Sequence, residues 1–400
     1  METDTESGAS GPTRSWPAVG TVAGWQVVAS ICYYATFAAT AGIKAEFGLS
    51  RFQVGIVIAT LTLGYTLFLF PAGALVDAFG DRPAMVGGLL GLGLGALGVA
   101  AAPTNGFLVL LGAVFVLGAA YSGAMPSTNR AVADRAPRGR YNLSVGLKQV
   151  GVTAGSAVAA LLVTGFAAIG FSWRAGFVAA ALCSFAVAVG FALRYRGTGG
   201  SGELTIPEVS LLVQNRSLRR LVAVGFFLGA SVFTATGYVV PYLDESVGFS
   251  VGVAGLVLAL MQVTGSAGRI VAGSLADRLP WGSASASLAV LGGQAVGAAV
   301  LLWLLPLFEG VAVYVAFAAL GVVVLGGTGL YHGALVVIAA DERSGAATAA
   351  GQTTINLGGL VVPPVFGLVA DHGGYEAAWP VLGACMAAAF LLTVFVRRTV

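Results

Sequence analysis

Residues 48–82 of this chain, GLSRFQVGIVIATLTLGYTLFLFPAGALVDAFGDR, return half a chain length later as residues 248–278, GFSVGVAGLVLALMQVTGSAGRIVAGSLADR. Both segments open on a Gly-x-Ser sequence, continue as a long apolar run and close near an Asp. A repeat with this offset predicts a tandem duplication, in which two similar halves face each other. The matching residues are Gly48, Ser50, Gly55, Val57, Ala59, Ala72, Gly73, Leu75 and Asp77, which correspond to Gly248, Ser250, Gly255, Val257, Ala259, Ala272, Gly273, Leu275 and Asp277.

The composition predicts that both halves lie in a membrane. Hydrophobic residues make up 57% of the chain and charged residues only 9%, and the mean hydropathy is +0.90. Such a chain cannot present its surface to water, and a helix crosses a bilayer with ~20 mostly apolar residues. The sequence therefore predicts an all-α integral membrane protein with twelve transmembrane helices, arranged as two pseudo-symmetric six-helix bundles around a central cavity. The predicted spans are 18–42, 52–72, 83–102, 107–128, 143–168, 174–195, 220–243, 252–272, 286–304, 311–340, 346–370 and 377–396.

Lys and Arg residues predict the orientation of these spans. Of the twenty in the chain, Lys44, Arg51 and Arg174 fall on one predicted side, and Lys148 and Arg269 fall inside predicted helices. All the others lie in termini or loops on the opposite side, which the positive-inside rule assigns to the cytoplasm. We therefore expect a multi-pass protein of the plasma membrane with both termini in the cytoplasm. The expected segments are a cytoplasmic tail (1–17), an N-terminal bundle (18–195), a cytoplasmic linker (196–219), a C-terminal bundle (220–396) and a cytoplasmic C-terminus (397–400).

A short motif follows the second and the eighth predicted spans. It is GALVDAFGDR at residues 73–82 and GSLADR at residues 273–278. This motif resembles the signature loop of the major facilitator superfamily, in which a Gly, three residues and an Asp precede a basic residue, a Gly and further basic residues. Ala78 stands where the family usually has a basic residue, and Pro280 interrupts the second copy.

The resemblance implies a secondary active transporter whose two bundles rock around a central cavity. It does not imply a substrate. At a tight corner between helices, Gly allows a close approach or a sharp turn, and a carboxylate caps a helix or pairs with an arginine. Such a contact latches one conformation of the transporter. The predicted gating residues are Gly73, Asp77, Arg82, Gly273, Asp277 and Arg278.

Polar residues inside the spans are the candidates for substrate binding, because charges in a membrane are costly and are usually functional. Lys148 is equally compatible with snorkelling to the inner interface and with facing the cavity, whereas Arg269 lies nearer the interface, which favours snorkelling or gating. No Asp or Glu lies in the middle of a predicted span. The candidate proton carriers are therefore His332 and three acidic residues near the ends of spans, Glu46, Asp244 and Glu245. The candidate binding residues are Tyr33, Tyr34, Tyr121, Lys148, Gln149, Tyr238, Gln262, Arg269, Tyr331, His332, Gln352 and Asn356; Tyr121 and Tyr331 stand in similar Tyr-x-Gly-Ala sequences.

Two cations inside predicted spans favour a small organic anion, such as a carboxylate, as the substrate of a carrier that works by alternating access, either as a proton-coupled symporter or as a facilitative transporter. Efflux of amphipathic compounds is the alternative: an apolar, aromatic cavity favours it, but Ser156 stands where drug antiporters of the family have Pro. A membrane receptor or an enzyme is disfavoured, because the sequence shows no nucleophile–base pair or phosphate-binding loop. A measurement of substrate flux in proteoliposomes would distinguish a transporter from a receptor or an enzyme. We expect a monomer in a lipid bilayer with no cofactor, no metal and no nucleic-acid partner.

Overall fold

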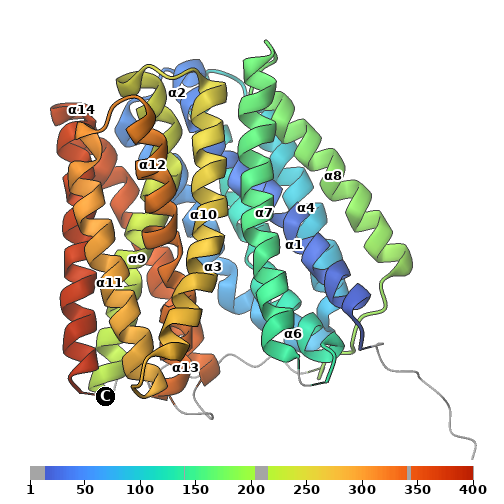
Figure 1. The fold of residues 1–400 in the computed structure, drawn as a ribbon. Helices are drawn as coiled ribbons and strands as arrows, with labels where there is room; N and C mark the ends of the chain where they lie inside the picture. Colours follow the sequence, from blue (N-terminus) through green and yellow to red (C-terminus); the bar gives the residue numbers. More distant parts are fainter. Residues whose placement is uncertain (1–13, 139, 203–214, 340–343, 400) are drawn as a thin grey trace, which may run out of the picture.

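The structure is a computed structural model that describes residues 14–138, 140–202, 215–339 and 344–399. Every regular element in these ranges is helical, which confirms the predicted all-α class (Figure 1). We call helices α1–α8 the first half and α9–α14 the second half. The first half contains α1 (Trp16–Ala38), α2 (Thr40–Phe47), α3 (Arg51–Phe79), α4 (Asp81–Ala101), α5 (Phe107–Tyr121), α6 (Ala124–Arg135), α7 (Tyr141–Ala168) and α8 (Arg174–Arg194).

The second half repeats this pattern with two π-helical turns and one 3-10 turn added. The start of α1 and the end of α14 lie at one end of the molecule, which we call the termini end, and α2 lies at the opposite end, the far end (Figure 1). The elements of the second half are α9 (Arg216–Tyr242), η2 (Leu243–Val247), α10 (Val251–Arg278), α11 (Ser283–Leu304), η3 (Leu305–Leu307), α12 (Val311–Leu320), η4 (Gly321–Leu325), α13 (Gly327–Ala339) and α14 (Ser344–Arg397).

Eleven helical segments in the described ranges are long and apolar enough to cross a membrane. The last of them, Ala346–Arg397, has 52 residues, which is more than twice the ~20 that one crossing needs. Gly374 interrupts it with the non-helical angles φ 71° and ψ 174°. The predicted spans 346–370 and 377–396 lie on either side of this interruption.

Three other predicted spans are divided in the structure. The predicted span 18–42 is α1, which stops at Ala38 before the separate helix α2 begins at Thr40. The span 107–128 breaks at Ser122–Gly123 between α5 and α6, and the span 311–340 passes through η4 between α12 and α13. The breaks in the spans 107–128 and 311–340 both contain glycine, which lowers helix propensity. A hydropathy pattern does not predict such breaks, because it depends only on how apolar each residue is.

The repeated Gly-x-Ser sequence has the same structural role in both halves. Gly48 (φ 62°) and Gly248 (φ 78°) end the preceding helix in the left-handed region, which residues other than glycine adopt at a cost. Ser50 then caps α3, and Ser250 caps α10, each by accepting a hydrogen bond from the third residue of the helix. The sequence repeat is thus also a repeat of local structure.

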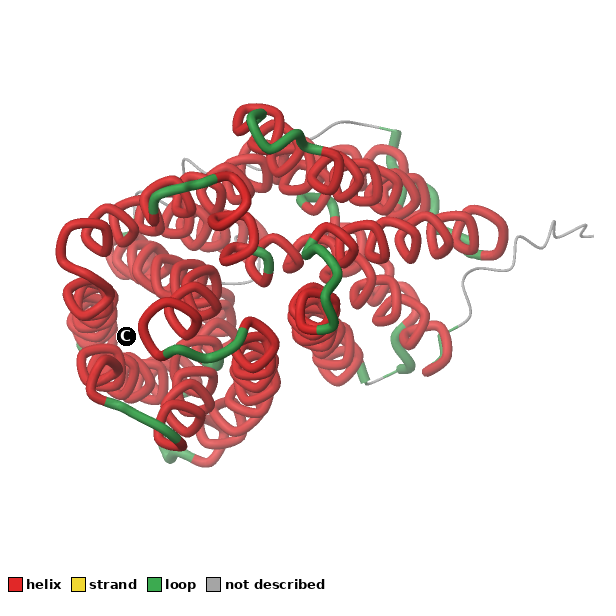
Figure 2. Tube along the Cα trace, turned by 90° about the horizontal axis from the view of Figure 1, so that it is seen from above, coloured by secondary structure: helices red, strands yellow, loops and turns green. Residues whose placement is uncertain are grey.

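The two halves meet along two helix pairs that contain the next repeated residue. α3 packs against α14, where a methyl group on Gly55 would lie 2.5 Å from the Pro363 carbonyl oxygen. α10 packs against α7, where a methyl group on Gly255 would overlap Thr164. Glycine at both positions therefore lets the helices of opposite halves approach closely. Seen from above, the helices form two groups that touch near the middle (Figure 2).

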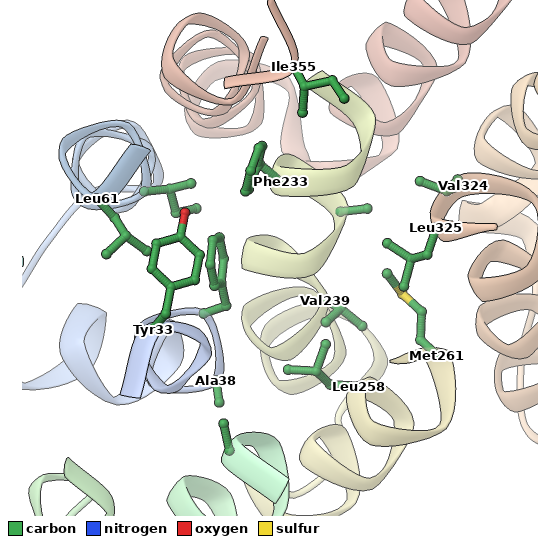
Figure 3. Packing of buried hydrophobic residues seen from close by; sticks show 14 of the residues in the cluster. Tyr33, Ala38, Leu61, Phe233, Val239, Leu258, Met261, Val324, Leu325 and Ile355 are labelled. Carbon is green, nitrogen blue, oxygen red and sulfur yellow. The ribbon is translucent and has the colours of Figure 1, made fainter. Parts of the chain in front are cut away.

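Apolar side chains fill the contact between the halves. Tyr33 of α1 and Leu61 of α3 lie near Phe233 of α9 in the close view (Figure 3). Phe37 stacks on Phe233 with 6.1 Å between ring centroids. The Thr40 hydroxyl donates to the Gly237 carbonyl at 2.8 Å, which ties α2 to α9 toward the far end. This core closes the far half of the contact.

Candidate functional site

The two cations predicted inside the membrane lie in opposite halves, without a carboxylate partner among the described residues. Lys148 of α7 is 1% exposed, and its ammonium donates to Asn129 Oδ1 of α6 at 2.7 Å. Arg269 of α10 is partly exposed and donates from Nε to the Leu325 carbonyl at 3.1 Å. Because Lys148 is buried against a neutral amide, it does not snorkel to the interface in this conformation.

His332 of α13 lies near both Lys148 and Arg269. Its Nδ1 is 2.8 Å from the Thr328 carbonyl oxygen, and its buried Nε2 has no partner in the described part of the chain. Arg269 also lies near Tyr34 and Tyr121 of the first half. The structure therefore brings five of the predicted residues, from five of the predicted spans and both halves, into one neighbourhood.

Several buried polar atoms around this neighbourhood lack a hydrogen-bond partner among the described residues. Gln352 donates to Asn356 Oδ1 at 2.9 Å, but the Asn356 amide nitrogen is left without an acceptor, as is that of Gln262 on α10. An unpaired buried donor costs about 1–3 kcal/mol, and nearly all such groups in folded proteins are paired. Hydrogen-bond donors without a partner, near two positive charges, are groups that can bind an anion.

An aromatic and polar cluster of the first half borders the site. Tyr33 stacks on Tyr121 with 4.2 Å between centroids, and the buried Tyr33 hydroxyl has no partner in the described ranges. The Tyr121 hydroxyl lies 3.2 Å from the donating Gln26 amide and 3.1 Å from the Ser30 hydroxyl. Sequence reasoning missed Gln26, Ser30 and Tyr65, because isolated polar residues in apolar spans resemble packing residues, and it missed Asn129, because that residue lies just beyond the predicted span 107–128.

Tyr331 and Tyr121 each form a hydrogen bond with the first helix of their own half, but with different kinds of partner. The Tyr331 hydroxyl donates to the Val222 carbonyl of α9 at 3.4 Å, and its ring is fully buried beside Gly225 and Gly351. Tyr331 is therefore a packing residue in this conformation, whereas Tyr121 belongs to a polar network. Gln149, half-buried on α7, has no hydrogen bond described here that would attach it to the site.

Tyr238 is predicted to bind substrate, and the structure places it in the far-end contact instead. Its hydroxyl donates to the Arg51 carbonyl at 2.6 Å and lies 3.0 Å from the Pro363 carbonyl oxygen. It therefore joins α9 to α3 and α14. No sequence pattern signals this role, because the polar tip of a tyrosine serves a ligand and a backbone carbonyl equally well.

Charged residues hold the halves together at the far end. Glu245 of η2 pairs with both Lys44 and Arg51 of the first half, each at 2.9 Å. Asp371 of α14 accepts the backbone N–H groups of Arg51 and Phe52 at 2.9 Å, and so binds the positive N-terminus of α3. The span-end acid Glu245 is thus occupied by ion pairs in this conformation. Glu46, another candidate, pairs with Arg174 at 3.0 Å.

The predicted gating residues of the first copy make contacts inside the first half, at the termini end. Asp77 lies 3.6 Å from Arg130, and Arg82 donates to the Ala192 carbonyl at 2.6 Å. In the second copy, Asp277 and Arg278 are exposed and form no ion pair in the described ranges.

The predicted role of Gly73 and Gly273 at this end is not seen. Each lies inside its helix, and no atom comes within 4 Å of the position that an added methyl group would take, so neither makes a close contact or a turn. The turn comes later in the first copy, at Gly80 (φ 90°), because helix α3 continues to Phe79.

Asp81, which stands at a position where the family motif has a basic residue, forms the most buried ion pair at this end. Its carboxylate is fully buried and accepts from Arg135 Nη1 at 3.0 Å, from the Tyr195 hydroxyl at 2.6 Å and from the Thr198 N–H at 2.8 Å. Burial raises the pKa of the Tyr195 phenol, and its hydrogen bond to Asp81 adds to the effect. Sequence reasoning missed this cluster, because its members lie far apart in the chain.

A surface groove of about 340 Å³ lies between α3, α4 and α5. Its walls are apolar residues such as Phe68, Leu75 and Ala120, and it contains none of the predicted binding residues. Within the described ranges, no group of three or more His, Cys, Asp or Glu side chains is placed to hold a metal ion.

Comparison with known proteins agrees with this architecture. A Bacillus subtilis hexuronate transporter is 24% identical to the chain over 378 residues, which cover 89% of this chain and 88% of that protein. A probable sulfoacetate transporter of Cupriavidus necator is also 24% identical over 378 residues, covering 89% of this chain and 87% of its own.

Solved structures share the fold over nearly the whole chain. A POT family transporter in complex with 5-aminolevulinic acid superposes with a TM-score of 0.78 at 11% identity, covering 97% of this chain and 98% of its own. A bacterial homolog of the human lysosomal transporter Spinster, in an inward-facing and unoccupied conformation, has a TM-score of 0.76 at 15% identity, with 96% and 98% coverage. The model of the Major Facilitator Superfamily matches residues 23–363. This chain therefore belongs to the Major Facilitator Superfamily of membrane transporters.

Proposed function

We propose that this transporter carries a small organic anion by alternating access. The observation that carries the proposal is the pair Lys148 and Arg269, two cations inside the membrane-spanning part with no carboxylate partner among the described residues. A charge within the bilayer costs ~2.5–3.5 kcal/mol on insertion scales. An anionic substrate compensates that cost whenever it is bound.

The names of the relatives favour the same class of substrate. Sulfoacetate and hexuronates, the compounds in those names, are small organic anions. At 24% identity the relatives support a class and not a compound. The open amide donors of Asn356 and Gln262 suit the oxygen atoms of a carboxylate or sulfonate, which accept several hydrogen bonds at once.

The topology proposed with this function has twelve spans. α14 crosses the membrane twice, on either side of Gly374, so that each half forms a six-helix bundle, residues 18–195 and 220–396, joined by the linker 196–219. The termini end faces the cytoplasm of a plasma-membrane protein, because the Lys and Arg residues of the loops gather there. The far end is then the outer side, and it is closed by Glu245 and Asp371.

Gating and coupling follow from this orientation. Asp77 and Asp277 lie at the inner ends of matching helices, where a new contact between the halves latches the opposite conformation. His332 is the proposed proton carrier of a proton-coupled monomer, since its Nδ1 faces the Thr328 carbonyl oxygen and its buried Nε2 is left as the ring nitrogen that takes a proton.

The test is uptake of radiolabelled compounds into proteoliposomes that contain the purified full-length protein. Sulfoacetate and glucuronate represent the anions, glucose a neutral solute, and a cationic dye the amphipathic class. We expect saturable flux of an anion alone. Flux of the dye without any anion flux would contradict the proposal.

Lys148→Ala should weaken binding of the transported anion about tenfold or more, as the loss of a charge-assisted hydrogen bond worth ~1.5–3 kcal/mol implies. Lys148→Arg should retain part of the affinity. Arg194→Gln, which removes an exposed cation at the end of α8, is the matched control. Normal binding by the Lys148→Ala variant would show that this cation does not contact the substrate.

A further inference from the structure

Lys148 and Arg269 occupy matching depths on two helices from opposite halves. α7 and α10 touch toward the far end, where Gly255 meets Thr164, and they separate toward the termini end (Figure 1). Lys148 lies about two turns from the termini end of α7, and Arg269 about two and a half turns from that end of α10. Both are therefore about 10–14 Å from the termini end, at 1.5 Å per residue.

Each cation is held only by neutral oxygen atoms in the described part of the chain. The amide of Asn129 accepts from Lys148, and the backbone carbonyl of Leu325 accepts from Arg269. The nearby His332 adds no negative charge, and the first-half neighbours of Arg269 are the tyrosines Tyr34 and Tyr121. Hydrogen bonds to an ionised acceptor are roughly twice as strong as those to neutral acceptors, so an anion competes well for both cations.

Alternating access requires that these two helix ends come together around the substrate. Closure removes water from the partly exposed Arg269 and brings the like charge of the buried Lys148 nearer to it. A single negative charge then leaves one cation buried without compensation, which is strongly unfavourable. Two negative charges on the solute, one facing each helix, neutralise both cations and so remove the repulsion between them.

We propose that the transported solute is a dianion that bridges Lys148 Nζ and the Arg269 guanidinium, and that this bridge draws α7 and α10 together at the termini end. The inference rests on the proposed transport of organic anions and adds the charge of the substrate and the cause of closure. Arg269 provides a planar fork that binds a carboxylate or sulfonate by two parallel hydrogen bonds, and Lys148 provides a point charge. The Asn356 amide nitrogen is the free donor for the central part of the solute.

The test compares matched pairs of ligands that differ by one charge. Malonate, succinate and glutarate are each titrated against the purified full-length protein by isothermal calorimetry, beside their monomethyl esters. We expect at least one diacid to bind about ten times more tightly than its ester, as one charge-assisted hydrogen bond implies. Arg269→Gln and Lys148→Gln should each reduce this preference to less than about twofold, while Arg194→Gln keeps it.

Distance measurements test the bridge itself. Spin labels at Leu143 of α7 and Leu275 of α10, both exposed, report the separation of the helix ends after the native cysteines are replaced. The bound diacid should shorten this distance in the wild-type background, and its ester at saturation should not. The Arg269→Gln variant should show no shortening with either ligand.

The outcomes distinguish this inference from the proposed function. Diacids and esters that bind equally well, or variants that keep the preference for diacids, would overturn the dianion bridge and leave anion transport intact. If no organic anion binds or is transported while a neutral or cationic solute is, the proposed function fails, and the bridge fails with it.

Discussion

Among the described residues, the ion pairs that join the two halves of this transporter lie at the far end and not at the termini end. At the far end, Glu245 and Asp371 of the second half bind Lys44 and the start of α3 in the first half. At the termini end, Asp77 and Asp81 pair with Arg130 and Arg135, so both members of each pair belong to the first half. Contacts across the halves set the conformation, whereas contacts within one half set its stability.

This difference explains why the same repeated sequence behaves differently at its two ends. The first part of the repeat, with Gly55 and Gly255, lies in the closed contact and brings α3 and α10 against the opposite half. The last part, with Gly73 and Gly273, has open space around it in this conformation. When the transporter changes state, the far-end contacts must break, and we expect the open residues at the termini end to gain partners.

The largest expected effect comes from filling the closed contact. A Gly55→Leu substitution places a side chain against the backbone of Pro363 and Pro364, which cannot move aside as a flexible side chain does. The far end should then stay open, and transport should fall by about tenfold or more, since tight packing of helices in a membrane depends on small residues. Gly112→Leu is the control, since nothing lies within 4 Å of that position. Wild-type flux in the Gly55→Leu variant would show that the tight contact is not needed for the cycle.

The second effect concerns stability at the termini end. Asp81→Asn leaves Arg135 buried without its counter-charge, and breaking a buried pair costs about 3–5 kcal/mol. We expect a clearly lower thermal midpoint in detergent. Asp77→Asn should cost less than about 1 kcal/mol, because its side chain is 61% exposed and its pair is longer, at 3.6 Å. Equal losses in both variants would contradict the distinction between the two carboxylates.

The smallest effect is a shift in conformation without a loss of stability. Glu245→Gln removes two partly exposed ion pairs between the halves, together worth about 1 kcal/mol, or about a fivefold change in the equilibrium. A cysteine at Ala38, buried between the halves, should then react faster with a reagent added at the far end. Glu376→Gln, at an exposed residue of the same end, is the matched control. An unchanged labelling rate would show that Glu245 does not hold the far end shut.

The amino-acid sequence was sufficient to predict the class of the fold, the membrane location and the family. Apolar runs of about 20 residues have few alternatives to a spanning helix, because backbone polar groups must be satisfied inside the segment. The repeat located Gly48, Ser50 and Gly55 and their counterparts, whose roles depend on local backbone geometry and close packing. Lys148 and Arg269 were visible as cations in apolar spans.

Which polar residues work together became clear only from the packing of the helices. Tyr238 and Gln262 look alike in sequence, as polar residues in apolar helices, yet one joins the halves at the far end and the other has an open amide near the site. Asp81 and Arg135 meet because α4 and α6 pack together. Hydropathy reports the free energy of placing a residue in a membrane, but partners are set by helix rotation and packing, which depend on contacts between segments far apart in the chain.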